Sequence, residues 1–233
     1  FGEYYCPYCA GLVARVEPFY RDYPEGIQRR EEGAMEALFA ALILTGFSMT
    51  MAGTSSPASG GEHLISHTLD MMASRDGIEH DLHGRQVGVA TIFCGALYER
   101  LWQDNMQAFA EEIMGAGDDG FWGPLEQAIA PYRDAKKKRV EEVQRRLREH
   151  PTLWQDVRGQ LAEPPMPAQQ LKSILQRGGA AHRLADIGVP RERFLAAVEH
   201  AGEIRERFSV LDLARCLGLL RRSAGEIVDQ WLM

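Results

Sequence analysis

The apolar residues of this 233-residue chain recur at three- and four-residue spacing along most of its length, which is the period of an α-helix. The segment 29–51 is an example, with a wide apolar stripe. That stripe comprises Ala34, Leu38, Ala41, Leu42 and Thr45. No segment shows convincingly the alternation of polar and apolar residues that is typical of a half-buried β-strand. The pattern therefore predicts an all-α, multihelical fold.

Proline and glycine divide the chain into helical segments. The predicted helices span residues 4–23, 29–51, 62–73, 82–105, 106–114, 124–150, 169–176, 191–207 and 211–232. Proline is densest in the run 163–167, where a helix cannot continue. We therefore expect a helical core that binds metal and substrate over residues 1–162, and a carboxyl-terminal helical segment over 163–233 that packs on the same domain.

The composition is that of an ordinary globular protein, with 45% hydrophobic and 25% charged residues. A formal net charge of -7 argues against a nucleic-acid partner. The basic residues of 136–148 alternate with apolar and acidic ones at helical spacing, which indicates a solvated amphipathic helix. Thr45, Gly46 and Ser48 interrupt the most apolar run, so we expect no membrane span and no membrane partner. The expected location is the cytoplasm.

Two of the four cysteines form a C-x-x-C motif, Cys6-Pro7-Tyr8-Cys9, which matches the glutaredoxin active-site tetrapeptide. Thiol–disulfide chemistry would need a preceding strand and a β-rich surrounding fold. Only five residues precede the motif, and the residues after it read as helix. We therefore expect no redox function here, and no four-cysteine zinc site, because there is no second C-x-x-C.

Histidines are the strongest indication of chemistry. If 62–73 is helical, His63 and His67 lie one turn apart on the same face. His83 follows where one helix gives way to the next, so the three imidazoles could converge on a metal such as Zn, Fe or Ni. The alternative is a solvated or hydrogen-bonded pair of histidines without a metal. His80 is expected to be an exposed loop residue.

A loop rich in Gly and Ser, residues 53–61, precedes the histidine helix. Such a loop at a helix start offers backbone N–H groups and hydroxyls to an anion, so Ser59 and Gly60 are candidates for binding a phosphate. Ser59 could also simply cap the helix, with Glu62 completing a capping box.

Two runs of residues carry a resemblance to a known family. They are Pro57-Ala58-Ser59-Gly60-Gly61-Glu62-His63-Leu64-Ile65-Ser66-His67 and Leu82-His83-Gly84-Arg85-Gln86-Val87-Gly88-Val89-Ala90. Together they resemble the metal-dependent dehydrogenases that include glycerol dehydrogenase, iron-containing alcohol dehydrogenase and dehydroquinate synthase. The P-A-S-G-x-E-H form is most similar to the sn-glycerol-1-phosphate dehydrogenases, as is the closing run 205–211.

The resemblance implies roles for three residues. His63 and His83 would bind the catalytic metal, which would be Zn or alternatively Ni or Fe. His67 would lie in the substrate pocket and transfer a proton or donate a hydrogen bond. The family's third ligand is an acidic residue of an amino-terminal domain that also binds NAD or NADP. Asp70, Glu62 or Asp81 could substitute for it here.

That nucleotide-binding domain is not recognisable in this chain, which has no G-x-G-x-x-G motif and no P-loop and begins at Phe1 without an initiator Met. We therefore expect the carboxyl-terminal helical half of a dehydroquinate synthase-like fold, inactive alone. The intact enzyme would be a homo-oligomer that reduces dihydroxyacetone phosphate to sn-glycerol 1-phosphate with NAD(P)H, in phospholipid metabolism. The alternatives are a glycerol dehydrogenase, a dehydroquinate synthase-type enzyme, or a helical interaction module without catalysis.

Overall fold

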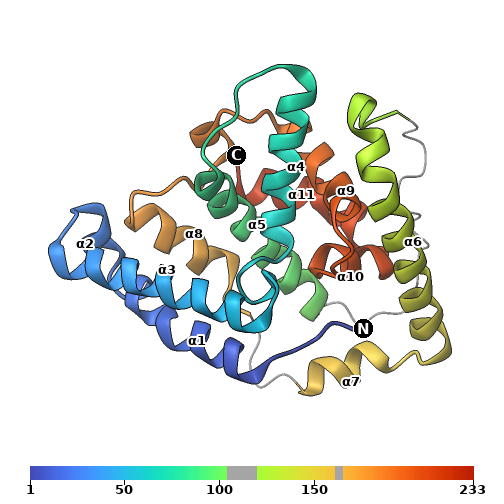
Figure 1. Cartoon of the computed structure of the whole chain (residues 1–233), viewed down its shortest axis with the longest axis horizontal. Coiled ribbons are helices and arrows are strands. Elements are labelled where there is room, and N and C mark those ends of the chain that lie inside the picture. The colour runs from blue at the N-terminus through green and yellow to red at the C-terminus, as the bar shows by residue number, and fades with distance from the viewer. Residues whose placement is uncertain (104–119, 161–164) are drawn as a thin grey trace.

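The structure is a computed structural model that describes residues 1–103, 120–160 and 165–233. These residues form helices and contain no β-strand, so the predicted all-α fold is confirmed over them. Figure 1 shows α4 and α5 near the middle of the molecule, with the other helices around them. The predicted helix 106–114 lies outside the described residues.

The α-helices are α1 (Pro7–Arg21), α2 (Pro24–Gln28), α3 (Glu32–Ala52), α4 (Gly61–Asp76), α5 (His83–Gln103), α6 (Glu126–Glu149), α7 (Leu153–Gln160), α8 (Ala168–Arg177), α9 (Arg191–His200), α10 (Val210–Cys216) and α11 (Leu220–Trp231). The short 3₁₀ turns are η1 (Ser56–Ala58), η2 (Gly123–Leu125), η3 (Leu184–Ile187) and η4 (Ala201–Ile204).

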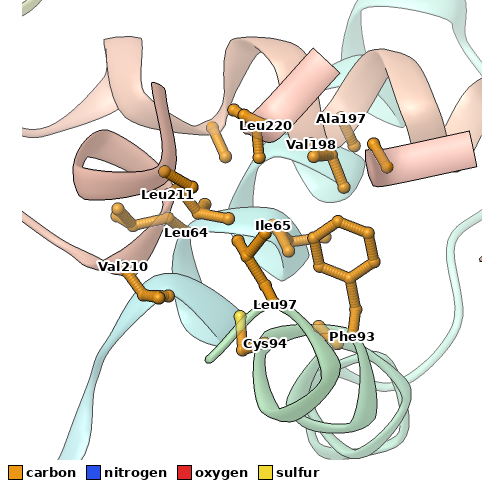
Figure 2. Packing of buried hydrophobic residues seen from close by; sticks show 14 of the residues in the cluster. Leu64, Ile65, Phe93, Cys94, Leu97, Ala197, Val198, Val210, Leu211 and Leu220 are labelled. Atoms are coloured by element: carbon orange, nitrogen blue, oxygen red, sulfur yellow. The ribbon is translucent and has the colours of Figure 1, made fainter. Parts of the chain in front are cut away.

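The core lies where α4 and α5 pack against each other and against α8, α9, α10 and α11. Figure 2 shows its centre, where Leu64 and Ile65 of α4 meet Phe93 and Leu97 of α5. Side chains of α9, α10 and α11 complete it, and they include Ala197, Val198, Val210, Leu211 and Leu220. One core thus joins residues from both sides of the proline-rich run. The division at 163–167 itself stays a prediction.

Two predicted helices near the carboxyl terminus are shorter than expected. The predicted helix 191–207 ends at His200 and continues only as the 3₁₀ turn η4. The predicted helix 211–232 is two helices, α10 and α11, which are separated at residues 217–219. Gly218 has φ +64°, which is in the left-handed region. Helices commonly end at a residue in this conformation, and that residue is usually glycine. The apolar register continues across this break, which is why the sequence reads as one helix.

The amino-terminal boundaries also differ. Helix α1 begins at Pro7 rather than Tyr4, because proline fits the first helical position and its ring prevents an earlier continuation. The predicted turn after Tyr23 is the short helix α2, and Arg30, with φ +56°, separates it from α3. Pro131 lies within α6, which is unbroken from Glu126 to Glu149.

Helix α3 corrects the expectation that no segment could span a membrane. Its 21 residues are long and apolar enough to do so by length and composition alone. Only 17% of its most apolar window is buried, whereas a core helix would be mostly buried. Helix α3 packs against α1 at one edge of the molecule (Figure 1), and several large apolar side chains of the pair face solvent. They include Tyr8, Phe19, Phe39, Leu42 and Phe47.

A buried ion pair fixes α6 to the start of α10. Lys136 Nζ lies 2.8 Å from Asp212 Oδ2 and also donates to the backbone carbonyl of Arg207, and both charged side chains are at most 1% exposed. Asp212 in turn accepts hydrogen bonds from the backbone and hydroxyl of Ser209, which caps α10. Burial lowers the pKa of Lys136, and the carboxylate of Asp212 offsets part of that effect.

Removing one partner of the Lys136–Asp212 ion pair should lower the stability of the fold. We expect Lys136→Met to lower the free energy of unfolding by about 3–5 kcal/mol, because the Asp212 carboxylate would remain buried without its counter-charge. Lys137→Met, one exposed position along, is the matched control and should change stability by less than about 0.5 kcal/mol. Urea unfolding followed by circular dichroism measures both. Equal stability of the two variants would contradict this account of the pair.

Candidate metal and substrate site

The three histidines singled out by the sequence lie together at the junction of α4 and α5. Helix α4 begins at Gly61 and places His63 and His67 one turn apart, and α5 begins at His83 after the loop 77–82. The ring centroids of His63 and His83 are 5.2 Å apart, and those of His67 and His83 are 4.7 Å apart with nearly parallel rings. The predicted convergence of the three imidazoles is therefore present in the fold.

In two of the three rings, one nitrogen lies within hydrogen-bond distance of a protein side chain. His63 Nδ1 lies 2.9 Å from Glu62 Oε1, which also accepts a 2.7 Å hydrogen bond from the backbone N–H of Gly60. His83 Nδ1 lies 2.8 Å from the hydroxyl of Ser66. In both rings Nε2 makes no hydrogen bond to the part of the chain that the structure describes, so it could meet an external ligand. This arrangement is common for metal-binding histidines, whose second nitrogen is held by a neighbouring group.

The third ring, His67, makes no hydrogen bond to any residue that the structure describes, and Asp70 follows it by three residues on the same flank of α4. One ligand atom from each of His67, Asp70 and His83 lies within 4.8 Å of the other two. Asp70 Oδ1 is buried and has no hydrogen-bond partner, although His80 Nδ1 lies 3.1 Å away. This buried carboxylate oxygen makes no hydrogen bond to the described residues, and its neighbours are His67, His83 and the imidazole of His80, with which it pairs when His80 is protonated. Such an oxygen next to imidazoles fits a cation. His80 itself is exposed.

The electrostatics favour neutral imidazoles. Burial lowers the pKa of His67, and the nearby His83 lowers it further, while Asp70 raises it in part. Burial and His63 lower the pKa of His83 in the same way. A neutral imidazole has the lone pair that a metal requires. Burial raises the pKa of Glu62, but the hydrogen bonds from His63 and Gly60 outweigh it and leave that pKa below its ordinary value.

The Gly/Ser loop before α4 is hydrogen-bonded to the rest of the protein, and its role in binding a phosphate stays a prediction. Gly60, not Ser59, is the N-cap of α4, and its backbone N–H is already bonded to Glu62. The backbone carbonyl of Ser59 accepts a hydrogen bond from Arg207. Ser59, Gly60, Glu62 and Arg207 all line a cavity of about 230 Å³. Arg207 supplies the positive charge there, which the loop sequence alone did not reveal.

Sequence reasoning thus missed some members of the site. Nothing in the sequence indicates the contact between Ser66 and Gln86, because it joins residues 20 positions apart on two helices. Asp70 was considered only as a substitute ligand, although its spacing of seven residues from His63 and three from His67 puts it on their flank of the helix. Arg207 lies in the run 205–211 that carries part of the family resemblance.

The C-x-x-C motif lies at the start of α1. Cys6 is the N-cap residue of that helix, and Cys9 is buried. Hydrogen bonds from the backbone and thiol of Cys9 lower the pKa of Cys6, whereas burial raises the pKa of Cys9. The four cysteines carry no disulfide. Residues 1–5, which precede the motif here, form no strand, and the absence of a redox function stays a prediction.

Comparison with known proteins identifies the group to which this arrangement corresponds. The chain is 38% identical over 102 residues to a glycerol-1-phosphate dehydrogenase [NAD(P)+] of Thermococcus kodakarensis, a stretch that covers 44% of this chain and 28% of that protein. Longer matches link it to proteins of the same name. Those of Halalkalibacterium halodurans and Natronomonas pharaonis are 25% and 28% identical over 209 and 207 residues, which is 90% and 89% of this chain and 45% and 40% of theirs. The chain is homologous to glycerol-1-phosphate dehydrogenases.

The chain spans less than half the length of the glycerol-1-phosphate dehydrogenases that it matches. Its all-α fold matches the helical carboxyl-terminal domain of a dehydroquinate synthase-like enzyme. No protein-family model matches the chain.

The lowered pKa values of two histidines can be tested directly. Histidine titrations followed by NMR should give midpoints below 6.5 for His67 and His83, and Asp70→Asn should lower both further, because Asp70 stabilises the protonated rings. Glu79→Gln removes an exposed carboxylate from the neighbouring loop and should leave both midpoints unchanged. Midpoints at or above 6.5 would contradict the partial desolvation to which the lowered pKa values are attributed.

Proposed function

We propose that this chain supplies the metal- and substrate-binding helices of an NAD(P)-linked, metal-dependent dehydrogenase that acts on glycerol 1-phosphate and dihydroxyacetone phosphate. The close approach of His63, His67 and His83 between α4 and α5, with ring centroids 4.7 to 6.4 Å apart, is the observation that carries the proposal. The homologues' names support the oxidoreductase class and the NAD(P) dependence. The remaining steps concern which residues do what.

In the proposed site, His63 and His83 hold a divalent metal, Zn or alternatively Ni or Fe, through the Nε2 atoms that the protein leaves free. When bound, the metal polarises the substrate carbonyl and the nucleotide supplies the hydride. The third ligand would be an acidic residue. Asp70 offers a buried carboxylate oxygen that has no hydrogen bond, so a second ligand set, His67 with Asp70 and His83, competes with the first.

His67 is the proposed proton-transfer group. Its ring has no hydrogen bond to the described protein, and its pKa is lowered, so it is a neutral base at pH 7 that is free to meet a substrate hydroxyl. One turn of helix separates it from His63, which places the proton acceptor beside the proposed metal position. In the reduction direction its protonated form would return the proton to the substrate oxygen.

The phosphate of the substrate is proposed to bind at the cavity beside the Gly/Ser loop. Arg207 provides a guanidinium there, and Ser59 and Gly60 line the same cavity, although the Gly60 N–H is bonded to Glu62. Arg207 is therefore the proposed partner of the phosphate, which would bind close to the carboxylates of Glu3 and Glu62 that also line the cavity. Glu62 bonds both to Gly60 and to His63, so this cavity adjoins the histidine cluster. A small substrate with a phosphate at one end and a carbonyl nearby would fit both parts of the site.

Zinc titration distinguishes the two ligand sets. We expect His63→Ala and His83→Ala to weaken zinc binding more than roughly 100-fold, since a direct ligand should matter more than a supporting residue. His150→Ala, at an exposed position beyond the cluster, is the control. If His67→Ala and Asp70→Asn abolish binding while His63→Ala does not, the second ligand set is the correct one. Isothermal titration calorimetry on the isolated chain measures all five variants.

Activity is tested in a chimera in which this chain replaces the matching 209-residue segment of the Halalkalibacterium halodurans relative. We expect the chimera to oxidise NAD(P)H when dihydroxyacetone phosphate is present, and the chain alone to be inactive. His67→Ala should reduce kcat of the chimera by about 10²–10⁴-fold, the usual contribution of a general acid–base. Turnover of unphosphorylated glycerol alone would contradict the proposed substrate. A folded chimera without any turnover would favour a non-catalytic helical module.

A further inference from the structure

The ring of His83 is held by a buried pair of polar side chains. The Ser66 hydroxyl of α4 lies 2.8 Å from His83 Nδ1 and 2.7 Å from Gln86 Oε1 of α5. Ser66 is 0% exposed and Gln86 is 1% exposed. Polar side chains so deep between two helices are unfavourable unless they are hydrogen-bonded, and an apolar pair would pack there at no such cost.

The directions of these hydrogen bonds follow from counting protons. Gln86 Nε2 donates to the backbone carbonyl of Asp81 at 3.3 Å, which fixes the amide so that Oε1 faces Ser66. The opposite amide orientation would bring two oxygens together. Ser66 has one hydroxyl proton, and both Gln86 Oε1 and the more distant His83 carbonyl, at 3.5 Å, can only accept it. The Ser66 oxygen must therefore accept from His83 Nδ1–H.

We propose that Ser66 and Gln86 are positioning residues that hold His83 as its Nδ1–H tautomer and direct the Nε2 lone pair into the histidine cluster. The tautomer follows from the hydrogen bonds alone, whereas its consequence for metal binding rests on the proposed function. His83 belongs to both candidate ligand sets, so the consequence does not depend on which set is correct.

The proposed effect of these hydrogen bonds is to pre-organise the His83 ring for metal binding. A neutral imidazole without such a partner can carry its proton on either nitrogen, and only the Nδ1–H form presents Nε2 to a metal. The Ser66–Gln86 pair removes the competing form before the metal arrives, and it orients the ring. A pair with only a structural role would change stability on substitution and would leave the tautomer as it was.

Three substitutions separate these possibilities. Ser66→Ala removes the acceptor of Nδ1–H, and Gln86→Leu frees the Ser66 proton to be donated to Nδ1, which favours the Nε2–H form. Thr68→Val is the matched control, because Thr68 is a buried residue of the same helix whose hydroxyl has no hydrogen-bond partner. The readouts are ¹⁵N NMR of the His83 ring in the metal-free chain at pH 7.5 and the zinc Kd.

We expect the wild-type chain and Thr68→Val to show Nδ1–H at His83. Ser66→Ala should show a mixture of tautomers and Gln86→Leu a shift towards Nε2–H, and both should raise the zinc Kd about 10–100-fold. An Nε2–H form in the wild-type chain would overturn the proposal, as would two variants with the tautomer and zinc affinity of Thr68→Val. If Ser66→Ala does not fold, the wild-type spectrum and Gln86→Leu decide. Absence of zinc binding in a wild-type chain with Nδ1–H would count against the proposed function and not against the tautomer.

Discussion

The packing of α4 against α5 is the interaction on which the candidate site depends. Buried apolar side chains of both helices meet there, and they include Leu64, Ile65, Phe93 and Leu97 (Figure 2). Burial of each large side chain contributes roughly 1.5–3 kcal/mol, against about 0.5–1.5 kcal/mol for a typical hydrogen bond. Packing therefore brings the imidazoles together, and the hydrogen bonds of Glu62 and Ser66 refine how the rings point.

The α-helical period explains which part of the site could be predicted from the sequence. His63, His67 and Asp70 are separated by four and three residues, so they share one flank of α4 whatever else the chain does. The approach of His83 was also foreseeable, since only a short loop separates it from that helix. These predictions depend on contacts that are local in the chain.

The parts that were wrong or missed depend on contacts between distant residues or on single backbone conformations. The sequence shows the Gly/Ser loop but not its partners, which are Glu62, bonded to the Gly60 N–H, and Arg207, bonded to the Ser59 carbonyl. The closing helix reads as continuous because its apolar register persists, although Gly218 breaks it. No sequence motif indicates the hydrogen bond between Ser66 and Gln86, because the two residues come together only when α4 packs against α5.

The distribution of charge around the cluster agrees with two separate binding tasks. The neutral imidazoles of His67 and His83 and the carboxylate of Asp70 offer lone pairs to a cation. The neighbouring cavity is lined by Arg207, whose guanidinium is the group that could pair with an anion, and by the carboxylates of Glu3 and Glu62. Glu62 stands between them, bonded to His63 on one side and to Gly60 on the other. A substitution of Glu62 would therefore affect both the histidine cluster and the cavity beside the Gly/Ser loop. A substitution of Ser66 or Gln86 would affect the histidine cluster alone.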